Sequence, residues 1–126
     1  MAKSDPLSDL PTGLKLFIKN LHSLTPEKLD DKNFPSWFSS VSANLTAHRL
    51  LPYVDGSRPS PSSTVSAVDK EGKVTLSPNP EYEKWLIIDD QLRACLLAII
   101  SPSVHPYLHG QTTAAAIWSH LQLRDS

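Results

Sequence analysis

Hydrophobic residues recur at helical spacing in three stretches of the chain. The first stretch, residues 33–51, is expected to begin at Asn33 as the N-cap and to end at Pro52, with one proline tolerated in its first turn. Its apolar stripe repeats every three or four residues and comprises Trp37, Val41, Leu45 and His48. Because this stripe is narrow, we expect the helix to pack on one face only.

The second stretch, residues 80–100, starts with two distinct faces and ends apolar on every side. Asn79 is expected to cap it, and two glutamates in the first turn favour the positive end of the helix dipole. The predicted inward stripe is Trp85, Ile88, Leu92, Cys95, Leu96 and Ile99, and the opposite, solvated face is assigned Asp89, Asp90 and Arg93. Since no polar face remains after Ala94, residues 94–100 are predicted to form the centre of a bundle, partly covered by other copies of the protein.

The third stretch is the last predicted helix. Ser101 and Pro102 end the preceding helix and can start a short one, PSVHPYLH, which Gly110 closes. Thr112 or Thr113 is expected to cap the final helix. The inward residues of that helix are Ala114, Ile117, Trp118 and Leu121.

The remaining segments complete an expected all-α fold, a small bundle of about four to five short helices. Residues 1–13 are expected to be a flexible tail, and residues 14–126 a single domain. Residues 14–24 fit either a strand or a short helix, and we favour the helix. Residues 52–80 are rich in Pro, Ser and Gly and are predicted to be a long loop inserted in the bundle. Within this loop the run TVSAVDKEGKVTL is typical of a β-hairpin.

Composition narrows the classes of partner. Twelve Lys and Arg against 13 Asp and Glu give a net charge of -1, and no basic cluster suggests a nucleic-acid surface in this segment. A lone cysteine, Cys95, cannot form an intramolecular disulfide and fits a reducing compartment. The start of the chain has no export signal, and no apolar run approaches the roughly 20 residues of a membrane span. We therefore expect a soluble, cytoplasmic chain without a membrane partner.

Candidate catalytic and metal-binding residues are few. His105 and His109 are four residues apart, but Pro106 lies between them and nothing nearby completes four zinc ligands. Asp89 and Asp90 are neighbours on a helix and point about 100° apart, so they do not converge on one substrate atom. Cys95 lies in an apolar run and is expected to be a buried, inert thiol. We expect no enzymatic activity, no metal, no cofactor and no small-molecule substrate.

The three tryptophans are expected to define the packing. Each lies near an apolar stripe, and a buried aromatic side chain removes about 150–250 Å² from water. The alternative, that they form platforms for stacking bases, requires interleaved Lys and Arg, and Trp85 and Trp118 have few such neighbours.

Four motifs in order resemble the Gag polyprotein of copia-type long-terminal-repeat retrotransposons, especially those of plants. The family has Asn-Tyr-x-x-Trp, a Tyr/Phe-Val-Asp-Gly segment, Trp followed by Asp on a long helix, and Thr-Ala-x-x-x-Trp-x-x-Leu. The resemblance covers residues 28–123, and Phe34 replaces the tyrosine of the first motif. The matching positions, with the stripe residues between them, are Asn33, Phe34, Trp37, Leu45, Tyr53, Gly56, Trp85, Leu92, Leu96, Ile99, Thr113, Ala114, Trp118 and Leu121.

The resemblance implies the N-terminal lobe of a capsid protein that self-associates into the shell of a virus-like particle. Its implied partners are further copies of itself or other Gag chains. Family members continue into a second lobe and often a zinc knuckle, whereas this sequence ends after the last helix. We therefore expect a fragment or a truncated copy that does not itself package RNA. The alternative is a host-retained, Gag-derived module that binds Gag and interferes with its assembly.

Overall fold

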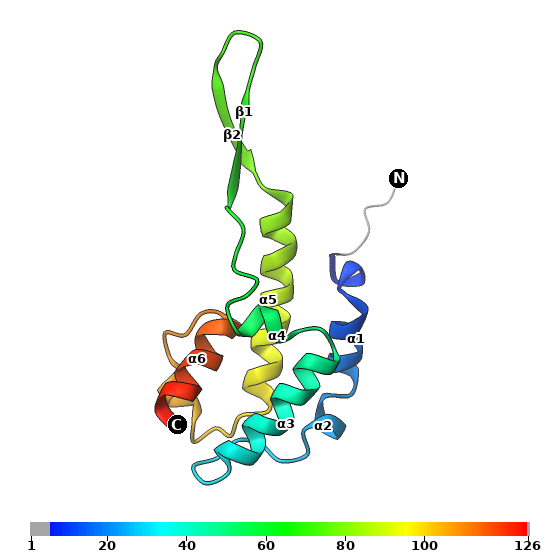
Figure 1. The fold of residues 1–126 in the computed structure, drawn as a ribbon, viewed down its shortest axis with the longest axis vertical. Helices are drawn as coiled ribbons and strands as arrows, with labels where there is room; N and C mark the ends of the chain where they lie inside the picture. Colours follow the sequence, from blue (N-terminus) through cyan, green and yellow to red (C-terminus); the bar gives the residue numbers. More distant parts are fainter. Residues whose placement is uncertain (1–5, 126) are drawn as a thin grey trace.

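The computed structural model describes residues 6–125, and most of them are helical (Figure 1). A short 3-10 helix, η1 (Pro6–Asp9), precedes α1 (Thr12–Lys19) and α2 (Leu21–Leu24). The next elements are α3 (Phe34–Ala47), α4 (Leu51–Val54), β1 (Thr64–Val68), β2 (Val74–Pro78), α5 (Pro80–Ala98), η2 (His105–Leu108) and α6 (Ala114–Asp125). The expected helical bundle is confirmed, but a two-stranded sheet prevents the fold from being purely all-α.

The core lies where the second half of α5 meets α1, α3 and α6 (Figure 1). Its largest fully buried side chains include Leu14, Phe17, Leu45, Leu92, Leu96 and Ile117. Leu29, in the loop before α3, is fully buried, and its backbone pairs with the end of α5. The Leu29 N–H donates to the Ile99 carbonyl at 2.9 Å, and the Ser101 N–H donates to the Leu29 carbonyl at 2.9 Å. This bridge fixes the loop between α2 and α3 against the bundle.

The folded part begins earlier than residue 14. Leu10 packs against the core, and Gly13 lies inside α1. A Cβ atom placed on Gly13 would collide with the backbone carbonyl oxygen of His48, so α1 approaches the end of α3 at a distance that only glycine allows. The expected flexible tail therefore does not extend to residue 13, and residues 1–5 of that tail lie outside the described residues. The helix favoured for residues 14–24 is confirmed as α1 and α2.

Helix α3 ends earlier than predicted. It stops at Ala47, because Arg49 adopts a left-handed backbone conformation with φ 63°. Pro52 therefore does not end α3, and instead lies in the first turn of the short helix α4, where a missing N–H costs nothing. Tyr53 and Val54 are buried, so the long loop starts after α4 and not at residue 52.

The ends of the other helices follow the predicted caps. The Asn79 side chain accepts a hydrogen bond from the Glu81 N–H at 3.1 Å, and the Thr113 hydroxyl accepts one from the Ala116 N–H at 3.0 Å. Gly110 closes the short helix η2 with φ 88°. Asn33 differs: it precedes α3, but its side chain accepts from the Asp30 N–H and donates to the Lys28 carbonyl. It therefore occupies the predicted N-cap position, but its side chain fixes the preceding loop and makes no capping hydrogen bond to the helix.

The end of α5 is surrounded less completely than predicted. Cys95, Leu96 and Ile99 are buried, but Ala94 and Ala98 are exposed. These two alanines are four residues apart on one side of the helix, and a methyl group presents little apolar surface to water. The segment 94–100 therefore lies at the centre of the bundle except for these two alanines, and their small exposed surface gives no support to the predicted covering by another copy.

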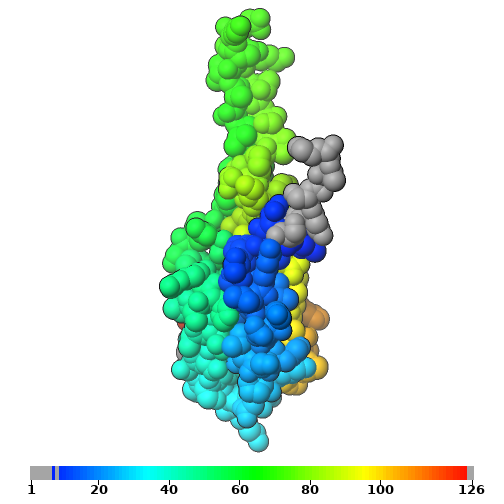
Figure 2. Space-filling view, turned by 90° about the vertical axis from the view of Figure 1, so that its right-hand side faces the viewer, coloured from blue at the N-terminus to red at the C-terminus, as the bar shows by residue number. Residues whose placement is uncertain are grey.

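The predicted hairpin is confirmed and projects from the body. Strands β1 and β2 pair antiparallel from Thr64↔Pro78 to Val68↔Val74, and all ten of their residues are exposed. Figure 2 shows the hairpin and the first turns of α5 extending together beyond the helical body. Among residues 6–125, no helix combines the length and apolarity that crossing a membrane requires.

Candidate functional site

Two of the three tryptophans form a buried aromatic cluster. Trp37 and Trp118 are 4% and 3% exposed, with ring centroids 6.0 Å apart, and Phe38 stacks on Trp118 at 4.7 Å. The Trp37 indole N–H donates to the Ile99 carbonyl at 3.1 Å. Phe34 extends the cluster by packing on Phe38 at 5.1 Å. The first and last motifs of the sequence therefore meet in the core.

The third tryptophan lies at the base of the long loop. Trp85 is only half-buried and packs against the edge of the core, so it is less enclosed than the sequence predicts. Its indole N–H donates to the Arg58 carbonyl at 3.3 Å, and Tyr82 stacks on it with ring centroids 6.4 Å apart. The Arg58 guanidinium in turn donates to the Tyr53 hydroxyl at 2.7 Å and lies over the Tyr53 ring. These contacts tie the second motif to the third and hold the loop against α5.

The remaining motif positions serve the fold. Gly56 has φ 88° at the turn after α4, a conformation that favours glycine. Thr113 caps α6, and Asn33 braces the loop before α3. The other positions are fully buried and comprise Leu45, Leu92, Leu96, Ile99, Ala114 and Leu121.

Asp89 is placed differently from the prediction. It is 1% exposed and faces α6, whereas Asp90 lies on the solvated face. Its carboxylate accepts a hydrogen bond from the N–H of Ala114, the first residue of α6, at 3.1 Å. Burial raises the pKa of the Asp89 carboxyl above its ordinary value, with the bond from Ala114 and the charge of Arg93 opposing that shift. Asp89 is therefore a buried structural acid that satisfies one N–H at the start of α6.

The other candidate groups are also engaged by the fold. Burial raises the pKa of the Cys95 thiol to about 11, so it stays protonated near neutral pH. A ring nitrogen of His105 lies 2.9 Å from the Leu97 carbonyl and 3.0 Å from the Ile100 carbonyl, whereas His109 is exposed. Within the described part of the chain, no three His, Cys, Asp or Glu side chains are grouped so that they could hold a metal ion.

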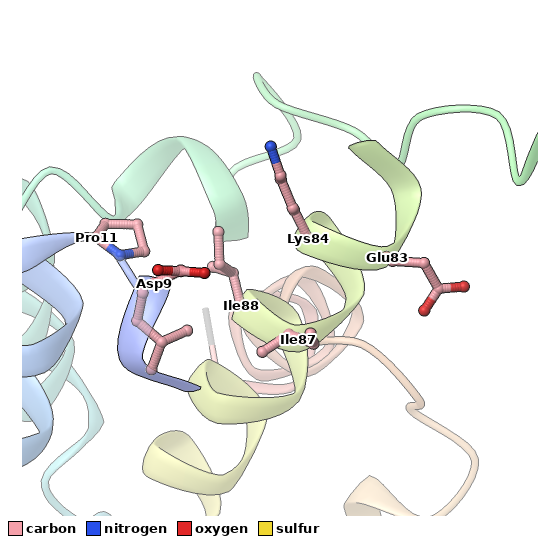
Figure 3. A pocket seen from close by; sticks show the side chains of 7 residues that line it. Asp9, Pro11, Glu83, Lys84, Ile87 and Ile88 are labelled. Atoms are coloured by element: carbon pink, nitrogen blue, oxygen red, sulfur yellow. The ribbon is translucent and has the colours of Figure 1, made fainter. Parts of the chain in front are cut away.

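A hollow with a volume of about 460 Å³ lies between the N-terminal segment and the first half of α5 (Figure 3). Ile88 points toward Pro11 and Asp9, while the Glu83 carboxylate points away. The lining residues are Asp9, Leu10, Pro11, Glu83, Lys84, Ile87 and Ile88. An aliphatic floor with charged residues at its edges suits a contact with another protein better than chemistry on a small molecule. No local sequence pattern predicts this hollow, because only the fold brings these two segments together.

The hairpin carries further exposed apolar side chains. Val68, Val74 and Leu76 are 69%, 60% and 70% exposed, and they share one face of the two-stranded sheet. Val65, on the other face, is also exposed. The projecting half of the molecule comprises the hairpin and the first half of α5 (Figures 1 and 2), and this half of α5 lines the hollow, whereas the aromatic cluster lies on α3 and α6. We therefore regard this half as the candidate protein-contact site.

Comparisons with known proteins relate most of the chain to plant retrotransposons. No protein-family model matches, and no solved structure matches. Over 105 residues, or 83% of the chain, the sequence is 33% identical to the retrovirus-related Pol polyprotein from transposon RE2 of Arabidopsis thaliana. It is 32% identical over 105 residues to the corresponding polyprotein from transposon RE1 of the same plant. The matched segment spans 7% of each polyprotein. These similarities support a retrotransposon origin for this sequence.

Proposed function

We propose that the chain is a structural protein of a retrotransposon particle, equivalent to the N-terminal lobe of a Gag capsid, which acts by contacting copies of itself. The similarity to retrotransposon polyproteins supports the origin, and the motif order supports the Gag assignment. The proposal includes an absence of catalysis. This absence is favoured because the buried carboxylate of Asp89 and the half-buried ring of His105 both bind backbone groups of the fold.

The observation that carries the proposal is the apolar surface of the projecting half. Large aliphatic side chains there lie outside the core, on a hairpin whose strand residues are all exposed. Exposed apolar patches bordered by charged residues are typical of protein contacts. Each patch is small, so a single contact should be weak, of order mM. Many weak contacts that act together can still hold a shell.

Sedimentation velocity over a wide range of protein concentrations tests the proposal. We expect the average mass to rise with concentration, and electron microscopy of the concentrated sample to show closed or curved assemblies. The sample should be treated with nuclease, and a parallel sample should receive single-stranded RNA. Because the net charge is -1, we expect added RNA to have little effect on the average mass. A chain that stays monomeric at millimolar concentration and high salt would overturn the proposal.

A further inference from the structure

We propose that strand β1 pairs edge to edge with β1 of a second copy, antiparallel, to form a four-stranded sheet between two helical bodies. This inference rests on the proposed self-association and names the surface that performs it. The ten strand residues of the hairpin are all exposed. An isolated two-stranded hairpin is marginal in water, whereas additional strands stabilise it.

The hydrogen-bond pattern shows which backbone groups remain open. The Asn79 N–H donates to the Ser63 carbonyl and the Asp69 N–H donates to the Lys73 carbonyl, each at 3.0 Å. Because bonded pairs alternate in an antiparallel ladder, the pairs between these two ends that contain residues 65 and 67 are also bonded within the hairpin. The N–H and C=O groups of Thr64, Ser66 and Val68 therefore point outward from β1.

The two edges of the hairpin are not equivalent. On β2, Pro78 lies opposite Thr64 at a position whose N–H would point outward, so that edge lacks one donor. Strand β1, with the sequence TVSAV, contains neither proline nor charge and is rich in β-branched residues. Proteins commonly protect open edges with proline or lysine, and β1 has neither. The open edge of β1 is therefore the one suited to receive another strand.

The β1 edge is complementary to itself. If Ser66 lies opposite Ser66 of the second copy, Thr64 of each copy lies opposite Val68 of the other. Residues 64, 66 and 68, whose N–H and C=O groups point outward, then all lie in hydrogen-bonded pairs between the two copies, because bonded pairs occur at every second residue of an antiparallel ladder. A twofold axis perpendicular to the sheet relates the two strands, as in a symmetric dimer. No charge is brought against another charge along the paired strands, because β1 has none.

The shape and size of the hairpin agree with a weak second-copy contact. The hairpin extends away from the body, so antiparallel pairing places the two helical bodies at opposite ends of the sheet (Figure 2). Val68, Val74 and Leu76 of both copies then lie on one face of the four strands. Pairing of two five-residue strands buries much less than the about 1,200–2,000 Å² of a stable interface. We therefore expect an association that depends on protein concentration.

Cysteine cross-linking tests the register. Residues in a bonded antiparallel pair have Cα atoms about 5.5 Å apart, which a disulfide can span. We expect Ser66→Cys to form a covalent dimer under mild oxidation at concentrations where the chain associates. Ala67→Cys is the matched control, because residue 67 is adjacent but lies on the other face of the sheet and is not opposite itself. The native Cys95 is buried and should not interfere.

A second pair of variants tests the backbone bonds. Ser66→Pro removes an outward-facing N–H and leaves the internal hairpin bonds in place, whereas Ser66→Ala retains that N–H. We expect Ser66→Pro to weaken association at least tenfold in sedimentation, and Ser66→Ala to leave it unchanged. Nuclear Overhauser effects between the Hα atoms of residues 66 and 76 in the alanine variant, and between those of residues 68 and 74 in both, should show that the hairpin persists.

The outcomes separate this inference from the proposed function. If Ala67→Cys cross-links as fast as Ser66→Cys, the proposed register is wrong. If neither cross-links while the chain still forms oligomers, copies meet through another surface and only this inference fails. If Ser66→Pro associates like the parent chain, the β1 edge is likewise not the contact. If the parent chain stays monomeric at every concentration, both this inference and the proposed self-association are overturned.

Discussion

The buried carboxylate of Asp89 allows a prediction about stability with a defined magnitude. It accepts a hydrogen bond from the N–H of Ala114, a fully buried residue at the start of α6. In Asp89→Ala this N–H loses its partner in a site from which water is excluded. A buried donor without a partner costs about 1–3 kcal/mol, and we expect the free energy of unfolding to fall by that amount. Asp89→Asn keeps an acceptor oxygen and removes the charge, so we expect a change within about 1 kcal/mol at neutral pH.

The same group predicts a pH dependence with a definite sign. The pKa of the Asp89 carboxyl in the folded chain is raised above its ordinary value of 3.8, chiefly because burial disfavours the charged form. A raised pKa in the folded state gives a stabilising contribution that is complete below pH 3.8 and is lost as pH rises through the folded-state pKa. In Asp89→Asn this contribution cannot change with pH. We therefore expect the stability of the Asn variant, relative to the parent chain, to increase from pH 3 toward neutrality.

Urea unfolding followed by tryptophan fluorescence at several pH values measures both effects. The difference between the two chains is the informative quantity, because carboxylates elsewhere titrate equally in both. If the parent chain gains stability relative to Asp89→Asn as pH rises, the helix dipole and the Ala114 bond outweigh the cost of burying the charge. That result would refute our account of this site. Equal stability of Asp89→Ala and the parent chain would refute the role of Asp89 at the start of α6.

Three further predictions address packing and the hairpin. Trp118→Ala should lower the free energy of unfolding by about 3–5 kcal/mol in the same urea assay. Trp85→Ala should lower it clearly less, because Trp85 is only half-buried, and equal losses would contradict this difference in burial. Replacing glycine by alanine inside a helix normally stabilises the protein by up to about 1 kcal/mol. We expect Gly13→Ala to destabilise it instead, because the new methyl group would collide with the His48 carbonyl, and a higher melting temperature would contradict this close approach. Replacing residues 64–78 by Gly-Gly should preserve cooperative melting measured by circular dichroism, because Ser63 and Asn79 are already paired; loss of cooperativity would show that the hairpin supports the core.

The sequence identifies the elements that depend on local signals. Helix α5 begins where Asn79 and the following proline place it, α6 begins after its Thr113 cap, and the hairpin forms around its predicted turn. These features depend on residues within a few positions of one another. The end of α3 lacks such a local signal, and the helix stops at Ala47 instead of at Pro52. The chain turns at Arg49, a residue without the usual preference for a left-handed conformation, so no local signal marked that position.

The error at Asp89 has a different cause, and the sequence contained a signal that could have prevented it. Asp89 lies four residues after Trp85 and three before Leu92, which places it on the apolar stripe of α5 and not opposite to it. Its charge alone favours the solvated face. An acid on an apolar stripe requires a buried donor. The donor, however, lies 25 residues away on another helix, so its identity could be seen only in the fold.

The division of α5 explains why the core and the contact surface can change independently. Its second half supplies Leu92, Leu96 and Ile99 to the core, while its first half carries Ile88 beside the hollow and continues into the hairpin. The strands of the hairpin add exposed side chains and nothing to the buried core. A substitution that removes an outward-facing backbone N–H of β1, such as Ser66→Pro, should therefore alter association without altering the free energy of unfolding of the helical body. A substitution at Trp118 should lower the free energy of unfolding without altering association, because a buried ring does not contact a partner. The free energies of unfolding are to be compared at low concentration, where the chain is not associated.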